Sequence, residues 1–183
     1  MIIYRLATLT DVAQLHELET LHVNAELSSY DPSLQAQGLS RGQLESLIEQ
    51  HWIMLALNEQ TIIGYVIAAK WSFFAKQSLY QKMIALLPNI NISQGQFPVK
   101  VTIANSCQYG PIWIDQQYRG QGIFAKLVDG LASKVKINVR FLVAYIAEDN
   151  ERSFKAHTQY ADMQVVDYFS FQQRDFYLLI KAV

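Results

Sequence analysis

The order of strand and helix patterns restricts this chain to a mixed α/β fold. Apolar runs of strand length alternate with segments whose apolar residues have helical spacing. Strands are predicted at residues 1–6, 52–58, 61–71, 101–114, 139–147, 165–171 and 176–180, and helices at 12–27, 41–50, 73–87, 123–135 and 150–160. Short turns join two of the strand pairs as hairpins. We therefore expect a mixed, mostly antiparallel central sheet with helices on both faces.

Local signals refine this order. Thr10 and Asp11 are predicted to cap the first helix, in which apolar residues from Val12 to Leu27 keep roughly helical spacing. The polar stretch NISQGQFP, residues 91–98, predicts a loop. Gly110-Pro111 interrupts the long strand pattern at 101–114 and predicts a bulge, because proline cannot donate to a strand ladder.

Composition and charge narrow the class of protein. The 183 residues are 51% hydrophobic and 17% charged, which fits one globular domain with a real core. A formal net charge of -1 gives no basic field that would favour nucleic acid or an anionic membrane. Cys107 is the single cysteine, so an internal disulfide and a cysteine-based metal cluster are excluded, and no metal is expected.

The distribution of apolar residues predicts the compartment. No uninterrupted apolar run approaches the roughly 20 residues that span a bilayer. The stretch MIIYRLATLTD has no positive segment followed by a long apolar one, as a signal peptide would have. We expect a cytoplasmic protein that does not associate with a membrane.

A glycine loop between the strand pattern 101–114 and the helix pattern 123–135 is the clearest binding signal. Its sequence is Arg119-Gly120-Gln121-Gly122-Ile123-Phe124. Glycine lets a backbone approach a ligand closely, and the N–H groups of a following helix favour an anion such as phosphate. An ordinary strand-to-helix loop that happens to contain glycine is the alternative.

Two common phosphate loops fit this segment poorly. A P-loop requires Gly-Lys-Ser/Thr at its end, whereas Ile123 and Phe124 follow Gly122. The dinucleotide pattern G-x-G-x-x-A is matched formally by Gly120, Gly122 and Ala125. In that pattern the first glycine follows the strand at once, but here IDQQYR intervenes. The dinucleotide alternative stays open.

The same segment resembles the coenzyme A motif of the GNAT acetyltransferase superfamily. That motif runs V-x-P-x-x-(R/Q)-x-x-G-x-(G/A), and Ile114, Arg119 and Gly122 take its valine, Arg/Gln and glycine places. Two positions depart from it. Gln116 replaces the common proline, and Phe124 stands where glycine or alanine usually allows close approach to the pyrophosphate.

A second motif and the element order extend the resemblance over most of the chain. Family members carry N-x-x-A/S-x-x-x-Y/H in the helix after the next strand, and Asn150, Ser153 and His157 have this spacing. Residues 72–100 are the exception, because the family strand normally turns back after a few residues. The resemblance thus implies a single GNAT-like domain over residues 1–183, with a family-atypical insertion at 72–100.

The resemblance also implies how acetyl-CoA would be held. The strand around residues 112–114 should splay from the strand 139–147, so that its backbone can pair with the pantetheine arm. The glycine loop should take the pyrophosphate, and Asn150 and Ser153 should bond the coenzyme. The expected coenzyme-binding residues are Ile112, Trp113, Ile114, Arg119, Gly120, Gln121, Gly122, Ile123, Phe124, Asn150 and Ser153.

Catalysis in this family needs a proton donor for the thiolate, usually a tyrosine in the last helix. His157 holds that place here, and Tyr160 is a weaker substitute that the sequence places in the core. Some members have a glutamate base where this chain has Tyr145, which could donate or relay a proton. No residue of this sequence stands at a motif position that would assign the general base for the amine. Glu26, Asp31 and Glu148 are candidate carboxylates for binding the amine.

These observations predict an N-acetyltransferase that moves an acetyl group from acetyl-CoA to a small-molecule or protein amine by direct attack. A non-catalytic domain of the same fold that binds CoA as a sensor is the alternative. The insertion should either wall the acceptor pocket or form a homodimer surface through Phe73 and Phe74.

Overall fold

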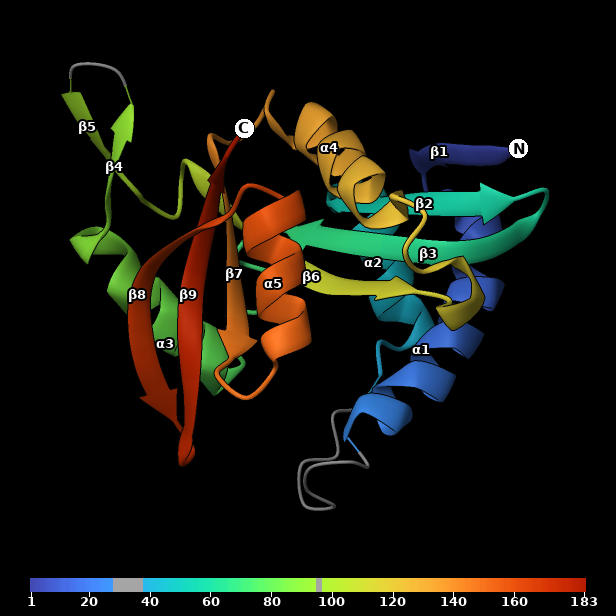
Figure 1. Cartoon of the computed structure of the whole chain (residues 1–183), viewed down its shortest axis with the longest axis horizontal. Helices are drawn as coiled ribbons and strands as arrows, with labels where there is room; N and C mark the ends of the chain where they lie inside the picture. Colours follow the sequence, from blue (N-terminus) through green and yellow to red (C-terminus); the bar gives the residue numbers. More distant parts are fainter. Residues whose placement is uncertain (28–37, 95–96) are drawn as a thin grey trace.

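The computed structural model describes residues 1–27, 38–94 and 97–183, and a seven-stranded sheet forms its centre (Figure 1). The strand order is β1-β2-β3-β6-β7-β9-β8, and every neighbouring pair is antiparallel except β6 and β7. The strands are β1 (Ile2–Leu6), β2 (Trp52–Asn58), β3 (Thr61–Ala69), β6 (Ser106–Ile114), β7 (Phe141–Ala147), β8 (Gln164–Phe171) and β9 (Arg174–Ala182). The mixed, mostly antiparallel sheet is therefore confirmed.

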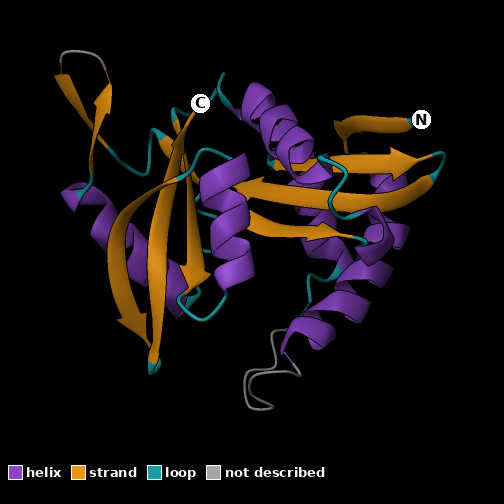
Figure 2. Ribbon diagram, in the orientation of Figure 1, coloured by secondary structure: helices purple, strands orange, loops and turns teal. Residues whose placement is uncertain are grey.

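Helices cover both faces of this sheet (Figure 2). One core cluster joins the sheet to α1 (Val12–Leu27), α2 (Arg41–Gln50) and α3 (Ser78–Leu86). The cluster on the opposite face joins it to α4 (Ile123–Val135) and to α5 (Glu151–Tyr160) with the segment that follows α5. We call these the α1 face and the α4 face.

The start of α1 differs from the sequence prediction. Thr8 caps a short 3-10 helix at Leu9–Asp11, which leads into α1. Asp11 Oδ2 accepts hydrogen bonds from the backbone N and the hydroxyl of Thr8, at 2.7 and 2.9 Å. Arg5 binds both Asp11 carboxylate oxygens, at 2.7 and 2.8 Å, and this pairing lowers the pKa of Asp11. These bonds to the Asp11 carboxylate hold the turn together. Thr8 is therefore the N-cap residue, Asp11 bonds to it, and the predicted cap at Thr10 is wrong.

The buried face of α1 also differs from its apolar pattern. Leu21 keeps the helical spacing but is 65% exposed. Glu19 is only 2% exposed and faces the sheet instead. Val12, Leu15 and Glu19 follow the spacing i, i+3 and i+7, which places them on one side of a helix. A carboxylate therefore enters the α1 face of the core.

The insertion departs most from the prediction. Residues 71–77 form turns, and α3 begins only at Ser78. The stretch predicted as a loop contains a two-stranded hairpin, β4 (Asn91–Gln94) and β5 (Phe97–Lys100), beyond a 3-10 helix at Leu87–Asn89. The buried Ile92 side chain supports this pairing. Residues 101–105 are not strand, so β6 is shorter than the apolar pattern suggests.

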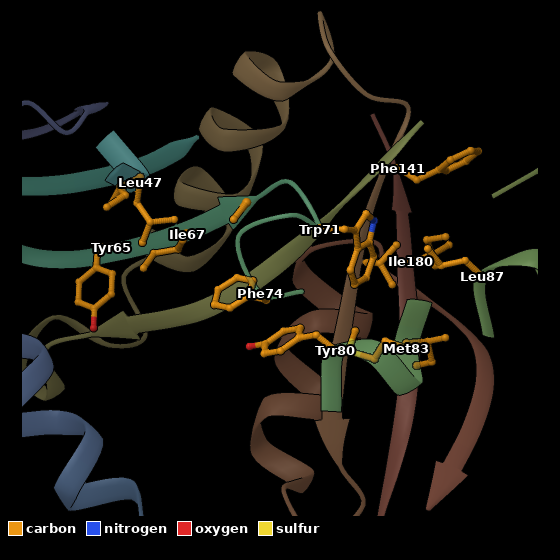
Figure 3. Close-up of a cluster of buried hydrophobic side chains, with 14 of the residues drawn as sticks. Leu47, Tyr65, Ile67, Trp71, Phe74, Tyr80, Met83, Leu87, Phe141 and Ile180 are labelled. Carbon is orange, nitrogen blue, oxygen red and sulfur yellow. The ribbon is translucent and has the colours of Figure 1, made fainter. Parts of the chain in front are cut away.

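The aromatic residues of the insertion form part of the core (Figure 3). Phe74 is 4% exposed, and its ring stacks on Tyr80 with centroids 4.3 Å apart. Trp71, immediately before the insertion, donates from Nε1 to Ser106 Oγ at 3.0 Å, which ties the start of the insertion to β6. Phe74 is thus not available as an exposed dimer surface. The insertion covers the α1 face of β7, β8 and β9, where α1 and α2 do not reach.

Replacing Met83 tests whether the insertion stabilises the whole domain. Met83 is fully buried in α3, so we expect Met83→Ala to lower the free energy of unfolding by about 2–5 kcal/mol. Lys82→Ala is the matched control on the exposed side of α3 and should change it by about 0.5 kcal/mol or less. Urea unfolding measures both values. Equal, small effects of both substitutions would show that the insertion folds separately from the core.

Candidate functional site

The candidate site lies where β6 and β7 separate. These strands pair only from Ser106 to Gln108 against Phe141 to Val143. Beyond this point β6 continues beside β3, and β7 continues beside β9. In Figure 1 β6 runs across the view while β7 stands nearly upright. The splay that the motif resemblance implies is therefore present.

A bulge in β6 shapes this opening. Val66 pairs with Ile112 and Ala68 with Tyr109, so two residues of β6, Gly110 and Pro111, lie opposite one residue of β3. The predicted bulge is confirmed. Ile112 lies three residues after Tyr109, and both side chains join the core of the α4 face. In a regular strand, residues at this spacing point to opposite faces. The extra residue of the bulge turns the Ile112 side chain back to the face of Tyr109.

The glycine loop leads from β6 into α4 with an exposed helix N-terminus. Gly120 and Gly122 have φ values of 77° and 76°, a conformation that favours glycine. A Cβ atom at either glycine would meet no atom within 4 Å, so open space lies beside the backbone. Gly122 is the N-cap of α4 and provides no side-chain cap for the N–H groups of the first turn. This arrangement can receive an anionic group such as phosphate.

Side chains of the loop hold its shape. Arg119 Nε donates to the Ile114 carbonyl at 2.9 Å, which ties the loop back to the end of β6. Gln121 Nε2 donates to the Gln117 carbonyl at 3.2 Å. Asn58 Nδ2 donates to the Tyr118 hydroxyl at 3.0 Å, so the β2–β3 turn braces the same segment. Arg119 thus has a structural contact in addition to any contact with a ligand.

Phe124 packs away from the loop backbone. Its half-buried ring lies edge-to-face on the imidazole of His157, with centroids 5.0 Å apart. The ring belongs to the contact between α4 and α5. The departure from glycine or alanine at this place is therefore accommodated by packing against α5.

His157 is enclosed rather than open. It is 4% exposed, and its Nδ1 lies 2.7 Å from the Ser153 carbonyl, which can only accept a hydrogen bond. Burial lowers the pKa of His157. The imidazole is thus neutral near neutral pH, with its proton on Nδ1 and directed to the helix backbone. Tyr109 packs against the ring edge-to-face, with centroids 5.5 Å apart.

The sequence analysis missed two buried polar groups at the opening. In the described part of the chain, the Tyr109 hydroxyl and Gln108 Oε1 have no hydrogen-bond partner. Both residues lie where the pairing of β6 with β7 ends. The signal was visible, because Gln108 and Tyr109 are polar side chains in a strand otherwise suited to a central, buried position.

The α1 face of the opening carries a buried carboxylate beside aromatic rings. The Tyr65 hydroxyl donates to Glu19 Oε1, and the backbone N of Leu39 donates to Glu19 Oε2 at 3.3 Å. The Tyr65 and Trp113 rings have centroids 5.9 Å apart. A cleft of about 490 Å³ adjoins this group. Its lining residues are Gln14, Glu17, Leu18, Leu21, Thr61, Ile62, Trp113, Asp115, Gln116 and Arg119.

Tyr145 lies on the α1 face, whereas His157 lies on the α4 face. The structure therefore does not bring these two candidate catalytic residues together on one side of the sheet. The Tyr145 ring lies edge-to-face on Tyr80 of the insertion, with centroids 5.9 Å apart. Burial raises the pKa of Tyr145. Figure 3 shows the Tyr80 hydroxyl turned away from Met83.

Asn150 caps α5. Its Oδ1 accepts from the backbone N of Ser153 at 3.1 Å, as the N-cap residue of a helix does. Tyr160 is 65% exposed, so its predicted place in the core is wrong. Cys107 is buried, and burial raises the pKa of its thiol to about 12. The side chain therefore packs as a small hydrophobic group.

Of the three candidate carboxylates named from the sequence, Glu148 is the one whose side chain is described. Glu148 is exposed and accepts from the Tyr168 hydroxyl at 2.9 Å. Asp31 and the side chain of Glu26 lie outside the described residues. Among residues 1–27, 38–94 and 97–183, no group of three or more His, Cys, Asp or Glu side chains is arranged to hold a metal ion.

Solved structures resemble this arrangement over its whole length. No family model matches the sequence, and no curated protein matches it. An acetyltransferase of the GNAT family from Streptococcus pneumoniae is 15% identical with a TM-score of 0.65, covering 100% of this chain and 99% of its own. The protein yncA from Salmonella typhimurium, solved with its cofactor acetyl-CoA, is 13% identical with a TM-score of 0.64, covering 99% of this chain and 93% of its own.

The chain has the fold of the GNAT superfamily. The resemblance predicted from the two motifs is thus confirmed at the level of the fold. A ribosomal-protein-alanine N-acetyltransferase from Brucella melitensis shares this GNAT fold at 15% identity, with a TM-score of 0.62 and 99% of each chain covered. None of the described helices is both long and apolar enough to cross a membrane.

Acid titration tests the environment of His157. Its pKa is lowered in the folded state, so between that value and the unfolded value of about 6.5 the unfolded chain binds more protons. The free energy of unfolding should therefore fall as the pH drops below about 6.5. His157→Gln should flatten this fall when urea unfolding is measured across the range. His51 also has a lowered pKa, so the difference between variant and wild type isolates His157. An identical pH slope in both proteins would contradict a buried neutral imidazole.

Proposed function

We propose that this chain transfers an acetyl group from acetyl-CoA to a primary amine. The observation that carries the proposal is the splay of β6 from β7 beside the uncapped N-terminus of α4. The splay offers backbone groups of two strands to an extended ligand, and the helix N-terminus offers N–H groups to its phosphates. Acetyl-CoA combines a pyrophosphate with an extended pantetheine arm, so it fits both parts.

The residues that would hold acetyl-CoA follow from this arrangement. The backbone from Gly120 to Phe124 would bind the pyrophosphate, where the two glycines leave open space. The edge of β6 from Ile112 to Ile114 would pair with the pantetheine arm, supported by Asn150 and Ser153 at the start of α5. Arg119 would add positive charge while it keeps the loop attached to β6.

The reaction needs one bond made, one bond broken and one proton moved. The amine nitrogen forms a bond to the acetyl carbon, and the bond between that carbon and sulfur breaks. The nitrogen loses a proton, and the sulfur leaves as a thiolate that gains one. Correct positioning of the two reactants can supply several kcal/mol of the required acceleration.

The acceptor amine would approach on the α1 face. The charged residues that line the cleft are Glu17, Asp115 and Arg119, and the buried Glu19 lies beside it, so acidic side chains outnumber basic ones around an amine bound there. Trp113 and Ile62 give it an apolar wall. A small-molecule amine and a protein amine both remain candidates for the acceptor.

Ligand-dependent melting tests the coenzyme. We expect CoA and acetyl-CoA to raise the melting temperature, since a ligand at a hundred times its Kd adds about 2.7 kcal/mol of stability. Gly122→Ala should weaken this shift, because its φ of 76° strains an alanine by about 1–2 kcal/mol beside the phosphate site. Gly42→Ala in α2 is the matched control, since its added Cβ meets no atom within 4 Å and its φ is not positive.

Each outcome of this experiment separates the candidate functions. A shift with CoA and release of thiol from acetyl-CoA by members of an amine panel would support the proposal. A shift with CoA but no thiol release with any amine would favour a CoA sensor. A shift with NAD alone would favour the dinucleotide alternative, and no shift with CoA would overturn the proposal.

A further inference from the structure

We infer that Tyr109, and not His157, stabilises the departing CoA thiolate by donating a hydrogen bond to it. This inference rests on the proposed acetyl transfer and concerns the residue that completes it. Tyr109 is a strand residue on the α4 face, whereas the family motif directs attention to α5.

The Tyr109 hydroxyl is a buried donor without a partner. The residue is 2% exposed, and no hydrogen-bond partner for its hydroxyl is found in the described part of the chain. A buried phenol that makes no hydrogen bond costs free energy, so protein interiors rarely retain one. A ligand atom that accepts this hydrogen bond would remove the cost. The thiolate of CoA is such an acceptor.

The position of Tyr109 matches that of the reacting sulfur. Gln108 is the last residue of β6 that pairs with β7, and Tyr109 is the next residue, at the apex of the splay. A pantetheine arm that lies between the separated strands would end with its sulfur near this apex. Tyr109 belongs to the core cluster of the α4 face, which also includes Ile123 at the start of α4, so its side chain faces the side on which the α4 N-terminus lies.

His157 supports Tyr109 instead of replacing it. The Nδ1 proton of His157 is directed to the Ser153 carbonyl at 2.7 Å, so it is not offered to a ligand. The Tyr109 and Phe124 rings both pack edge-to-face on the imidazole, at 5.5 and 5.0 Å. The histidine thus fixes the orientation of the Tyr109 ring, and we assign it a positioning role.

Gln108 provides a second unpartnered group at the same apex. Its Nε2 donates to the Tyr109 carbonyl at 2.8 Å, while its Oε1 is buried and has no partner among the described residues. Two consecutive residues therefore keep unused hydrogen-bonding atoms where the strands part. Because successive strand residues alternate, the two side chains point to opposite faces of the sheet, so each face of the opening has one such group.

The proton balance is simple. As the bond from carbon to sulfur breaks, the sulfur leaves as a thiolate and the Tyr109 hydroxyl donates a hydrogen bond to it. Burial raises the pKa of Tyr109, so the phenol keeps its proton. The amine nitrogen releases one proton to solvent, and the thiolate takes one proton from solvent as CoA leaves. No oxidant, reductant or further reactant is needed.

The thiol of bound CoA reports on this contact without any knowledge of the acceptor. The ultraviolet absorbance of the thiolate gives the ratio of thiolate to thiol in the CoA complex as the pH is raised. A hydrogen bond from Tyr109 favours the thiolate, so Tyr109→Phe should lower this ratio by about tenfold or more at a given pH. Tyr168→Phe, the same change at an exposed site on β8, should leave the ratio unchanged.

Stability and turnover complete the test. Because the Tyr109 hydroxyl has no partner in the protein, Tyr109→Phe should keep or raise the melting temperature of the ligand-free protein. With an amine that reacts with the wild type, thiol release should fall by about a hundredfold, because one hydrogen-bond donor to the developing charge is lost, with little change in the KM for acetyl-CoA. His157→Gln should lower the rate less and should leave Tyr109 able to shift the thiol titration.

The outcomes distinguish this inference from the proposed function. An unchanged thiolate ratio and rate in Tyr109→Phe, in a protein that binds CoA and releases thiol, would overturn the inference and leave the proposed function standing. A large loss of melting temperature in Tyr109→Phe would also overturn it, since the hydroxyl would then have a structural partner. A wild type that does not bind CoA would overturn the proposed function itself.

Discussion

The separation of β6 from β7 is the constraint on which the rest of the structure depends. These central strands share hydrogen bonds only from Ser106 to Gln108, and each then keeps one edge without a neighbouring strand. Backbone N–H and C=O groups are costly to bury without partners. An opening of this kind in the middle of a sheet is therefore retained where a ligand can supply the missing partners.

The opening divides the sheet into two halves, and the apolar side chains of each half are buried by different segments of the chain. On the α1 face, α1 and α2 pack on β2 and β3, whereas the insertion packs on β7, β8 and β9. Tyr80 of the insertion packs on Tyr145 of β7, and Trp71, immediately before the insertion, bonds to Ser106 of β6, so contacts reach both sides of the opening. The insertion therefore closes a core that the divided sheet would otherwise expose, and it helps to set the position of β7 relative to β6.

Sequence reasoning succeeded where one local cause determines the structure. The positive φ values of Gly120 and Gly122 and the cap by Asn150 follow from residue types with strong conformational preferences. The sequence-based prediction was wrong where contacts between residues far apart in the sequence determine the local structure. Phe73 and Phe74 continue a helical pattern but lie in turns because their rings pack against the core. The burial of Glu19 depends on Tyr65, 46 residues away in sequence, which no local pattern reveals.

The site residues show the same limit in a sharper form. A motif names positions along the chain, but chemistry depends on which polar atoms are left without partners after folding. His157 occupies the motif position, yet the Ser153 carbonyl in its own helix engages its Nδ1. Tyr109 and Gln108 belong to no motif, yet they keep unpartnered buried atoms at the apex of the opening. A protein that retains such atoms gives up stability in the absence of ligand. That cost is explained most directly if the binding of substrate recovers it.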